Sequence, residues 1–299
     1  MSAHKQLLSS LVVLNVMVIA SACLSRAAAE DAPKIAASEW GFTETDWPWW
    51  RGPDRNGIAA ANQKPPLNWS NSKNVVWRTP VPGRSHGSTI VVGNHVILQA
   101  ADLANSEQSV ICLDRATGKE VWKTVVHAGG MEGKENAKST LASSTPACDG
   151  ERIFVNFLNG GSVHTTALDR SGKKLWQTKI TGFVVHQGFA SSPALYESLV
   201  LVAADNKGTG ALVALDRKSG DVVWRHERPK VPNYTSPIIL RIAGKDQAIF
   251  TGCDLVTSLD PRTGKKLWEI AGATTECVTS TVTDGNLIFT IDLKCPIRS

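Results

Sequence analysis

A motif of about eleven residues recurs four times in the chain, and this repeat constrains the fold more than any other feature. Its copies are CLDRATGKEVW (112–122), ALDRSGKKLW (167–176), ALDRKSGDVVW (214–224) and SLDPRTGKKLW (258–268). The tryptophan of NVVW, Trp77, fits as an earlier copy of the last strand. A serine marks a second position upstream of each motif, at Ser88, Ser144, Ser192, Ser236 and Ser280. The motif and the upstream serine recur together along the chain, and two markers that repeat in step indicate a repeat architecture.

Each repeat is expected to contain four short strands. In the second repeat the strands are predicted near 145–148, 152–157, 163–168 and 174–180, because β-branched runs alternate there with turn clusters such as CDGER, LNGGS and DRSGKK. No stretch after the first 29 residues shows a helical period of apolar residues. The sequence therefore predicts an all-β fold, a β-propeller of four-stranded antiparallel blades with four complete repeats and partial first and last blades.

The repeated residues are interpreted as a structural joint and not as a catalytic site. The aspartate of each motif opens a tight turn, where its carboxylate can accept backbone N–H groups, and the glycine supplies positive φ. The tryptophan is expected on the outer strand, where it covers the seam to the next blade. Because the same constellation occurs four times, we expect docking at Trp77, Trp122, Trp176, Trp224 and Trp268 and at Gly118, Gly172, Gly220 and Gly264.

Residues 1–29 have the features of an export signal. Lys5 gives a positive start, LVVLNVMVIA (11–20) is an apolar run, and Ala27, Ala28 and Ala29 are small residues of the type that signal peptidase reads. An N-terminal membrane anchor and lipidation at Cys23 are the alternatives. The expected location of the protein is the periplasm or cell envelope, with membrane contact only by association or through a lipid at Cys23.

Charge and cysteine content narrow the function classes. The chain carries a formal charge of +5, with 32 Lys and Arg against 27 Asp and Glu. Loss of Lys5 and Arg26 with the signal leaves 30 against 27, or +3, which is too mild for a nucleic-acid-binding surface. No cysteine pair has CxxC spacing, so no structural metal site is predicted. An exported protein could still pair some of the five remaining cysteines.

The motif A-L-D-x-x-S/T-G-x-x-x-W resembles the tryptophan-docking repeat of PQQ-like β-propellers, over about residues 45–292. This family includes quinoprotein alcohol dehydrogenases and the outer-membrane assembly lipoprotein BamB. The segment WPWWRGPDRNG (47–57) is similar to a stretch that begins many exported BamB-like or PQQ-binding-like repeat proteins. The resemblance implies the fold strongly and the function weakly.

The family's propellers close with about seven or eight blades, whereas only four whole repeats are present here. In such rings the early strand, here around Trp77, completes the last blade. The chain is therefore expected to be truncated or altered at its C-terminus, to form a strained five-bladed ring, or to leave an open arc with unpaired strand edges. The expected domains are the signal at 1–29, a non-repetitive segment at 30–73 that packs on the propeller, and the incomplete PQQ-like propeller at 74–299.

Ligand or partner contacts are expected in the loops that lead into the innermost strands. There the side chains are polar and differ from repeat to repeat, while the joint residues stay constant. The candidates at this channel mouth are Arg84, His86, Lys138, His186, Gln187, Asn233, Tyr234 and Glu276. Solvated loop residues around a wet channel are the plain alternative.

Two functions remain after these observations. The first is an exported, non-catalytic scaffold of BamB-like type that binds envelope proteins or an unidentified small ligand without a cofactor. The second is a PQQ-dependent oxidoreductase for alcohols or sugars, in which Glu276 and Asn233 would serve PQQ and Ca²⁺. No adjacent cysteine pair is present, although the family's dehydrogenases typically carry one. The nucleophile elbow, the phosphate loop and the HExxH helix are also absent from the sequence.

The cluster of Trp47, Trp49 and Trp50 is interpreted as a structural plug. Pro48, Gly52, Pro53 and Gly57 prevent regular structure around it. We expect Trp47 and Trp50 to pack into one end or the rim of the propeller and Arg51 to donate to loop carbonyls. A sugar or ligand cage is the alternative.

Overall fold

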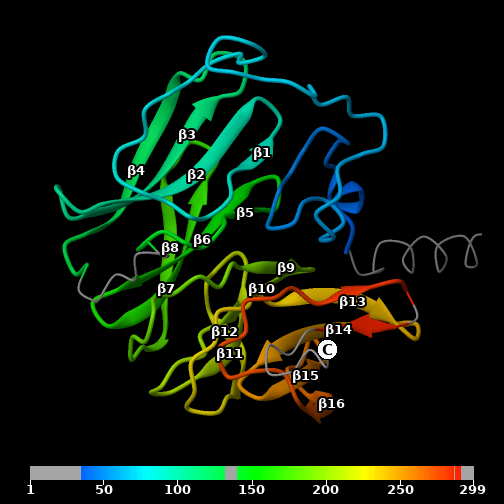
Figure 1. Ribbon diagram of the computed structural model, residues 1–299. Coiled ribbons are helices and arrows are strands. Elements are labelled where there is room, and N and C mark those ends of the chain that lie inside the picture. The colour runs from blue at the N-terminus through cyan, green and yellow to red at the C-terminus, as the bar shows by residue number, and fades with distance from the viewer. Residues whose placement is uncertain (1–34, 132–139, 286, 291–299) are drawn as a thin grey trace, which may run out of the picture. The chain divides into compact units, whose positions relative to one another are not determined.

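Four antiparallel sheets of four strands follow one another along the chain (Figure 1). The computed structural model describes residues 35–131, 140–285 and 287–290. In each of the four sheets, strands that are consecutive in sequence are also neighbours in the sheet. The all-β fold with four-stranded antiparallel blades is therefore confirmed. The predicted signal, Cys23, Lys138 and Cys295 lie outside the described residues.

The sheets are named blades 1 to 4 in chain order. Blade 1 consists of β1 (Ile90–Val92), β2 (His95–Asp102), β3 (Glu107–Asp114) and β4 (Glu120–Ala128). Blade 2 consists of β5 (Ala147–Cys148), β6 (Arg152–Asn159), β7 (Ser162–Asp169) and β8 (Lys174–Gly182). Blade 3 consists of β9 (Ala194–Tyr196), β10 (Leu199–Ala203), β11 (Ala211–Asp216) and β12 (Val222–Glu227). Blade 4 consists of β13 (Ile238–Ile242), β14 (Lys245–Gly252), β15 (Leu255–Leu259) and β16 (Lys266–Ala271).

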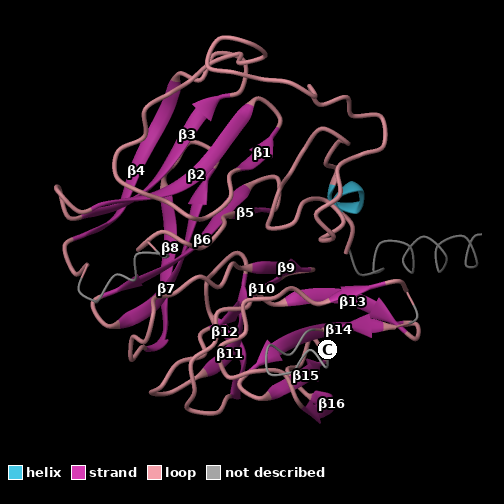
Figure 2. Cartoon of the chain, in the orientation of Figure 1, coloured by secondary structure: helices cyan, strands magenta, loops and turns pink. Residues whose placement is uncertain are grey.

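The strands of blade 2 lie close to their predicted ranges, and the two ends of the repeat region are less regular. A two-stranded sheet of β17 (Val282–Thr283) and β18 (Ile288–Phe289) follows blade 4. The prediction of an early strand around Trp77 was wrong. Residues 75–80 have no strand assignment, although the Trp77 side chain still docks on blade 1. Besides the strands, the described residues contain the short 3₁₀ turn η1 (Ala37–Trp40), drawn in Figure 2, and no membrane-spanning helix.

The core lies between neighbouring blades. One buried cluster joins blade 1 to blade 2 through residues such as Ile97 and Ile153. A second joins blade 2 to blade 3 through Phe154 and Val200, and a third joins blade 3 to blade 4. Burial of apolar surface at these three interfaces is the main favourable term that holds successive blades together.

The recurring motif forms the predicted joint at the outer edge of each interface. The indole N–H of Trp122 donates to the carbonyl of Arg170 in the turn of the next blade, at 3.0 Å. Trp176 and Trp224 make the same bond to Arg217 and Pro261, at 3.1 and 2.9 Å. Trp77 donates to Arg115 at 2.8 Å in the same way. Each indole therefore ties one repeat to the next, as the sequence predicted.

The turn residues also behave as predicted. The carboxylate of Asp216 accepts the N–H groups of Lys218 and Ser219 at 2.8 and 2.9 Å, and the other three motif aspartates accept equivalent bonds. The four turn glycines have φ between 69° and 87° and lie against the indole of the preceding repeat, at Gly118, Gly172, Gly220 and Gly264. Trp268 is the exception among the motif tryptophans, because its N–H donates at 2.7 Å to Gln247 of its own blade.

The tryptophan cluster near the N-terminus contributes Trp49 to the core between blades 2 and 3. Trp49 is 1% exposed, whereas Trp47 and Trp50, the two residues that the sequence analysis named, are only half-buried. Trp47 pairs its backbone with Val91, so the chain is extended there. Arg51 donates to the carbonyls of Asn56 and Arg55 at 2.7 and 3.3 Å, in agreement with its predicted role.

The cysteines within the described residues are unpaired thiols. Cys112, Cys148, Cys253 and Cys277 are all buried. Desolvation raises the pKa of Cys112 and of Cys148 to about 11. The expectation that an exported chain could pair some of its cysteines is not met among these four.

Candidate functional site at the loops between blades

Four of the predicted site residues meet at the entrances to the innermost strands. His186 and Gln187 lie in the loop between β8 and β9, Tyr234 in the loop between β12 and β13, and Glu276 in the loop that follows β16. We call these four residues the mouth cluster. Three successive inter-blade loops supply it, so residues 90 positions apart in sequence come into contact.

Hydrogen bonds connect all four members of the mouth cluster. The Nδ1 atom of His186 lies 3.0 Å from the Tyr234 hydroxyl and 3.3 Å from Glu276 Oε1. Gln187 Nε2 donates to the second carboxylate oxygen of Glu276 at 3.0 Å. The His186 and Glu276 side chains are 28% and 39% exposed, so the cluster is accessible from solvent.

The cluster is polar and carries one carboxylate. Desolvation and the nearby charge of Glu276 raise the pKa of Tyr234 to about 12, so the phenol stays protonated at neutral pH. A protonated phenol can donate one hydrogen bond and accept another. The arrangement is therefore suited to hydrogen bonding and to attracting a cationic group through Glu276.

Asn233 lies in a separate, buried network and not in the mouth cluster. Its Nδ2 atom lies 3.0 Å from Asp205 Oδ2 and 2.9 Å from the Thr235 hydroxyl. Asp205 in turn pairs with Arg228 at 3.2 Å, and both of these side chains are almost fully buried. This network fixes the loops between blades 3 and 4, so Asn233 has a structural explanation.

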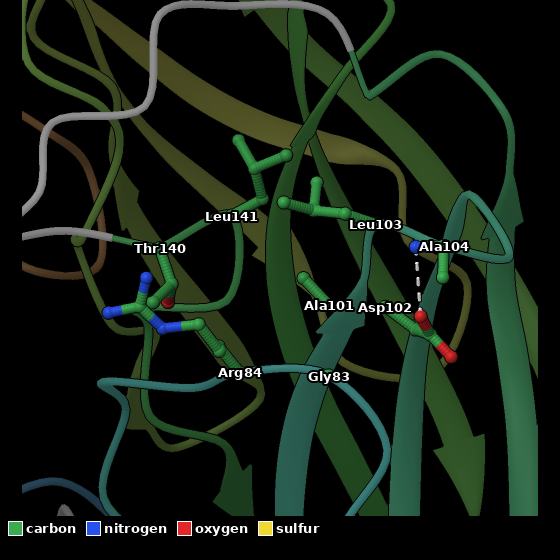
Figure 3. A pocket seen from close by; sticks show the side chains of 8 residues that line it. All are labelled: Gly83, Arg84, Ala101, Asp102, Leu103, Ala104, Thr140 and Leu141. Atoms are coloured by element: carbon green, nitrogen blue, oxygen red, sulfur yellow. Dashed lines mark hydrogen bonds between the residues drawn. The ribbon is translucent and has the colours of Figure 1, made fainter.

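Arg84 and His86 are not among the four residues of the mouth cluster and belong to the exposed loop that enters blade 1. The backbone of Arg84 pairs with Ala101, and His86 donates its N–H to the carbonyl of Ala142 at 3.2 Å. Arg84 borders a pocket of about 250 Å³. In Figure 3 the guanidinium of Arg84 lies beside Thr140, away from the carboxylate of Asp102.

Sequence reasoning missed the arginines of the repeat turns. Arg217, which follows Leu-Asp in the third motif, donates to Asp149 of the preceding blade at 2.7 Å. Its guanidinium also lies 4.5 Å from the ring centre of Trp40. Arg262 likewise forms an ion pair with a carboxylate of the preceding blade, Glu197 of blade 3. The recurrence of arginine at Arg115, Arg170, Arg217 and Arg262 was the signal that could have identified this second joint.

The alternative function would require calcium and a quinone to be held by residues that include Glu276 and Asn233. Ca²⁺ requires six to eight oxygen ligands, several of them from carboxylates. The described residues hold no group of three or more His, Cys, Asp or Glu side chains placed to bind a metal ion. Both oxygens of Glu276 are bonded within the mouth cluster, and Asn233 Nδ2 donates within the Asp205 network, while Asn233 Oδ1 is buried without a hydrogen-bond partner.

Comparison with known proteins places the chain in a family. A family model described as outer membrane protein assembly factor BamB matches residues 106–292, which is more than half of the chain. No curated protein sequence matches the chain. The chain is similar in structure to a quinohemoprotein alcohol dehydrogenase from Comamonas testosteroni, with 14% identity, a TM-score of 0.56 and coverage of 85% of this chain and 47% of that one.

The chain is also similar to the crystal structure of BamB from Moraxella catarrhalis. The identity is 19%, the TM-score is 0.46, and the match covers 67% of this chain and 55% of that one. The chain thus spans about half the length of the solved structures that it resembles. The likeness to the dehydrogenase shows the fold. The chain belongs to the PQQ-like repeat β-propeller family of the outer membrane protein assembly factor BamB.

Proposed function

We propose that the protein is an exported, non-catalytic scaffold that binds another protein of the cell envelope through its mouth cluster. The observation that carries the proposal is the meeting of His186, Tyr234 and Glu276 from three successive loops. The joints of the blades repeat, while these loop residues differ at equivalent positions. A rigid repeated frame with a variable polar surface is what a binding site on a scaffold requires.

The charge of the cluster defines the partner that it suits. Its one formal charge is the partly exposed carboxylate of Glu276, set among hydrogen-bonding groups. A lysine or arginine of the partner would find an anion and several hydrogen-bond partners there. Such a contact gives specificity and association rate more than raw affinity.

Site-directed photo-crosslinking in cells tests this proposal. A photoreactive residue at position 187 should give a discrete adduct with an envelope protein, and the same residue at Lys218, in an exposed turn of blade 3, should give none. The change Glu276→Gln should reduce the adduct about tenfold through loss of the charge, on the scale of 1–3 kcal/mol for a charged hydrogen bond. Glu120→Gln, on the exposed outer strand β4, is the matched control and should leave the adduct unchanged.

Two outcomes would contradict the proposal. Equal crosslinking at positions 187 and 218 would show that the mouth cluster does not select the partner. A quinone absorption band together with alcohol-dependent dye reduction, after addition of PQQ and Ca²⁺, would show that the protein is an enzyme. Export is tested separately by N-terminal sequencing of protein from the envelope fraction, which should begin at Glu30 if residues 1–29 are removed.

A further inference from the structure

Arg55 is a buried arginine that reaches from the N-terminal segment to blade 3. It is 6% exposed, and one terminal nitrogen donates to the carbonyl of Leu195 at 2.9 Å. Its guanidinium carbon lies 4.4 Å from the ring centre of Trp49, which is itself 1% exposed. A buried guanidinium requires compensation of its charge, because desolvation of an unpaired ion costs several kcal/mol.

The buried Arg228 and the partly buried Arg217 obtain that compensation from carboxylates, and Arg55 does not. Arg228 pairs with Asp205, and Arg217 pairs with Asp149. Within the described part of the chain, Arg55 makes no ion pair. The Nε–H of Arg55 and the indole N–H of Trp49 are both buried donors without an acceptor. Native structures rarely leave such donors unpaired, and a bound water or ion is the usual explanation.

A small void lies beside these two donors. Its volume is about 10 Å³, and Trp49, Trp50 and Arg55 line it together with Ser192 and Ser236. That volume holds one particle of about the size of a water molecule. Polyatomic anions such as sulfate or phosphate are therefore too large.

Two serine hydroxyls add donors to the lining of the void. The oxygen of Ser192 already accepts the N–H of Thr145, and the oxygen of Ser236 accepts the N–H of Ser192, at 3.0 and 2.9 Å. Each hydroxyl can still donate its own proton. No carboxylate lines the void. A neutral water would leave the charge of Arg55 uncompensated, whereas a halide accepts from these donors and also supplies the opposite charge.

From these contacts we infer that Arg55, Trp49, Ser192 and Ser236 form a binding site for a single monatomic anion of the chloride class. The anion neutralises the buried guanidinium and accepts the two orphaned N–H groups. It thereby fixes the N-terminal segment to the innermost strands of blades 3 and 4. This inference is independent of the partner proposed for the mouth cluster.

The site is tested by comparing thermal unfolding in sodium chloride, sodium bromide and sodium gluconate at equal ionic strength. Chloride and bromide should raise the midpoint by about 2–5 °C over gluconate once they exceed their dissociation constant about tenfold. Arg55→Met should abolish this difference. Arg217→Met is the matched control, because Arg217 also lies over a tryptophan but has a carboxylate partner, and this variant should keep the full halide effect.

The same comparison can overturn the inference. Equal midpoints in halide and gluconate for the unaltered protein, or a halide effect that persists in Arg55→Met, would show that no such site exists. If Arg55→Met does not fold, bromide-soaked crystals of the unaltered protein decide the question. An anomalous peak within hydrogen-bond distance of Arg55 Nε and Trp49 Nε1 supports the site, and its absence at that position rejects it.

Discussion

Gly220 shows how closely a single residue is fitted at a blade joint. Its φ is 79°, and a Cβ atom added to it would lie 2.6 Å from two ring carbons of Trp176. The glycine is required twice, once for its backbone conformation and once for the contact with the indole. Gly244, in the β13–β14 turn of blade 4, has a φ of 73°, but a Cβ there would meet nothing within 4 Å.

These two glycines form a matched pair for a stability measurement. Gly220→Ala should lower the free energy of unfolding by about 1–3 kcal/mol more than Gly244→Ala, because only the former displaces an indole from its joint. Both changes carry the cost of a left-handed alanine, about 1–2 kcal/mol. Urea unfolding of both variants checks the difference, and equal losses would show that the indole adds nothing to the role of Gly220.

The N-terminal tryptophans show which residue-scale features the sequence could not predict. Three indoles within four positions are equivalent in composition, so the sequence predicted a plug but not its buried member. The selection depends on the backbone, since Trp47 lies in an extended pairing and Arg51 and Arg55 have φ of 65° and 58°. These left-handed residues turn Trp49 and Arg55 inward, and nothing in the local residue types specifies that choice.

At the scale of the element, hydroxyl groups connect the innermost strands of successive blades. The N–H of Ser88 donates to the hydroxyl of Thr145, whose own N–H donates to Ser192, and Ser192 donates to Ser236. Of the predicted marker serines, Ser192 and Ser236 act as side-chain acceptors in this series, whereas in blade 2 the acceptor is Thr145 and not Ser144. Side-chain oxygens here satisfy backbone donors at the blade interfaces where no strand pairing is possible.

Removal of one hydroxyl from this series should leave a backbone donor unsatisfied. Thr145→Val keeps the shape of the side chain and should lower stability by about 1–2 kcal/mol, because the Ser88 N–H loses its acceptor. Ser88→Ala alters an exposed side chain and should change stability by less than about 0.5 kcal/mol. Denaturant titration of the two variants measures the contrast, and a neutral Thr145→Val would show that water replaces the hydroxyl.

Two histidines face each other between blades 1 and 2. The rings of His127 on β4 and His164 on β7 have centres 5.2 Å apart, and Lys174 and Lys179 add positive charge nearby. Desolvation, His164 and Lys174 lower the pKa of His127 to about 4, against 6.5 for an exposed histidine. Between about pH 4 and pH 6.5, His127 is therefore protonated in the unfolded chain and neutral in the folded protein.

The stability contributed by neutral His127 is present above about pH 6.5 and is lost as the pH falls toward 4. Unfolding of His127→Gln near pH 5 should take up about one proton fewer than unfolding of the unaltered protein. The stability of the variant should therefore fall less steeply with acidification than that of the unaltered protein. Urea unfolding from pH 7 to pH 4.5 gives the slope, with His86→Gln as the exposed control. The same slope in the unaltered protein and in His127→Gln would contradict the assignment.

At the scale of the whole molecule, stability is independent of disulfides among the described cysteines. Burial raises the pKa of the Cys112 and Cys148 thiols to about 11, so few thiolates are available to react near pH 8. A thiol reagent should label none of the four described cysteines, Cys112, Cys148, Cys253 and Cys277, in the folded protein and all four after unfolding in reductant. Rapid labelling of any of these four would show that the core opens readily.

The fold was predictable from the sequence and the site was only partly predictable, for one physical reason. The joint of Trp176 with the Gly220 turn involves one repeat and its successor, and it recurs, so the pattern reveals it. The contact of His186 with Glu276 depends on two loops that share no pattern. The sequence placed both residues at equivalent loop positions, but it could not separate them from Asn233, which turns into the core instead.

The tryptophan joints have a consequence for how the chain folds as it is made. Each indole binds a carbonyl that lies 37 to 48 residues later in the sequence. During synthesis a blade can pair its own strands as soon as they emerge, but the tryptophan of its outer strand has no carbonyl to bind until the turn of the next blade has followed. Folding is thus expected to proceed from the N-terminus with a delay of one repeat, and a chain that has emerged beyond Trp224 but not as far as Pro261 should have Trp176 docked while Trp224 has not yet met its turn.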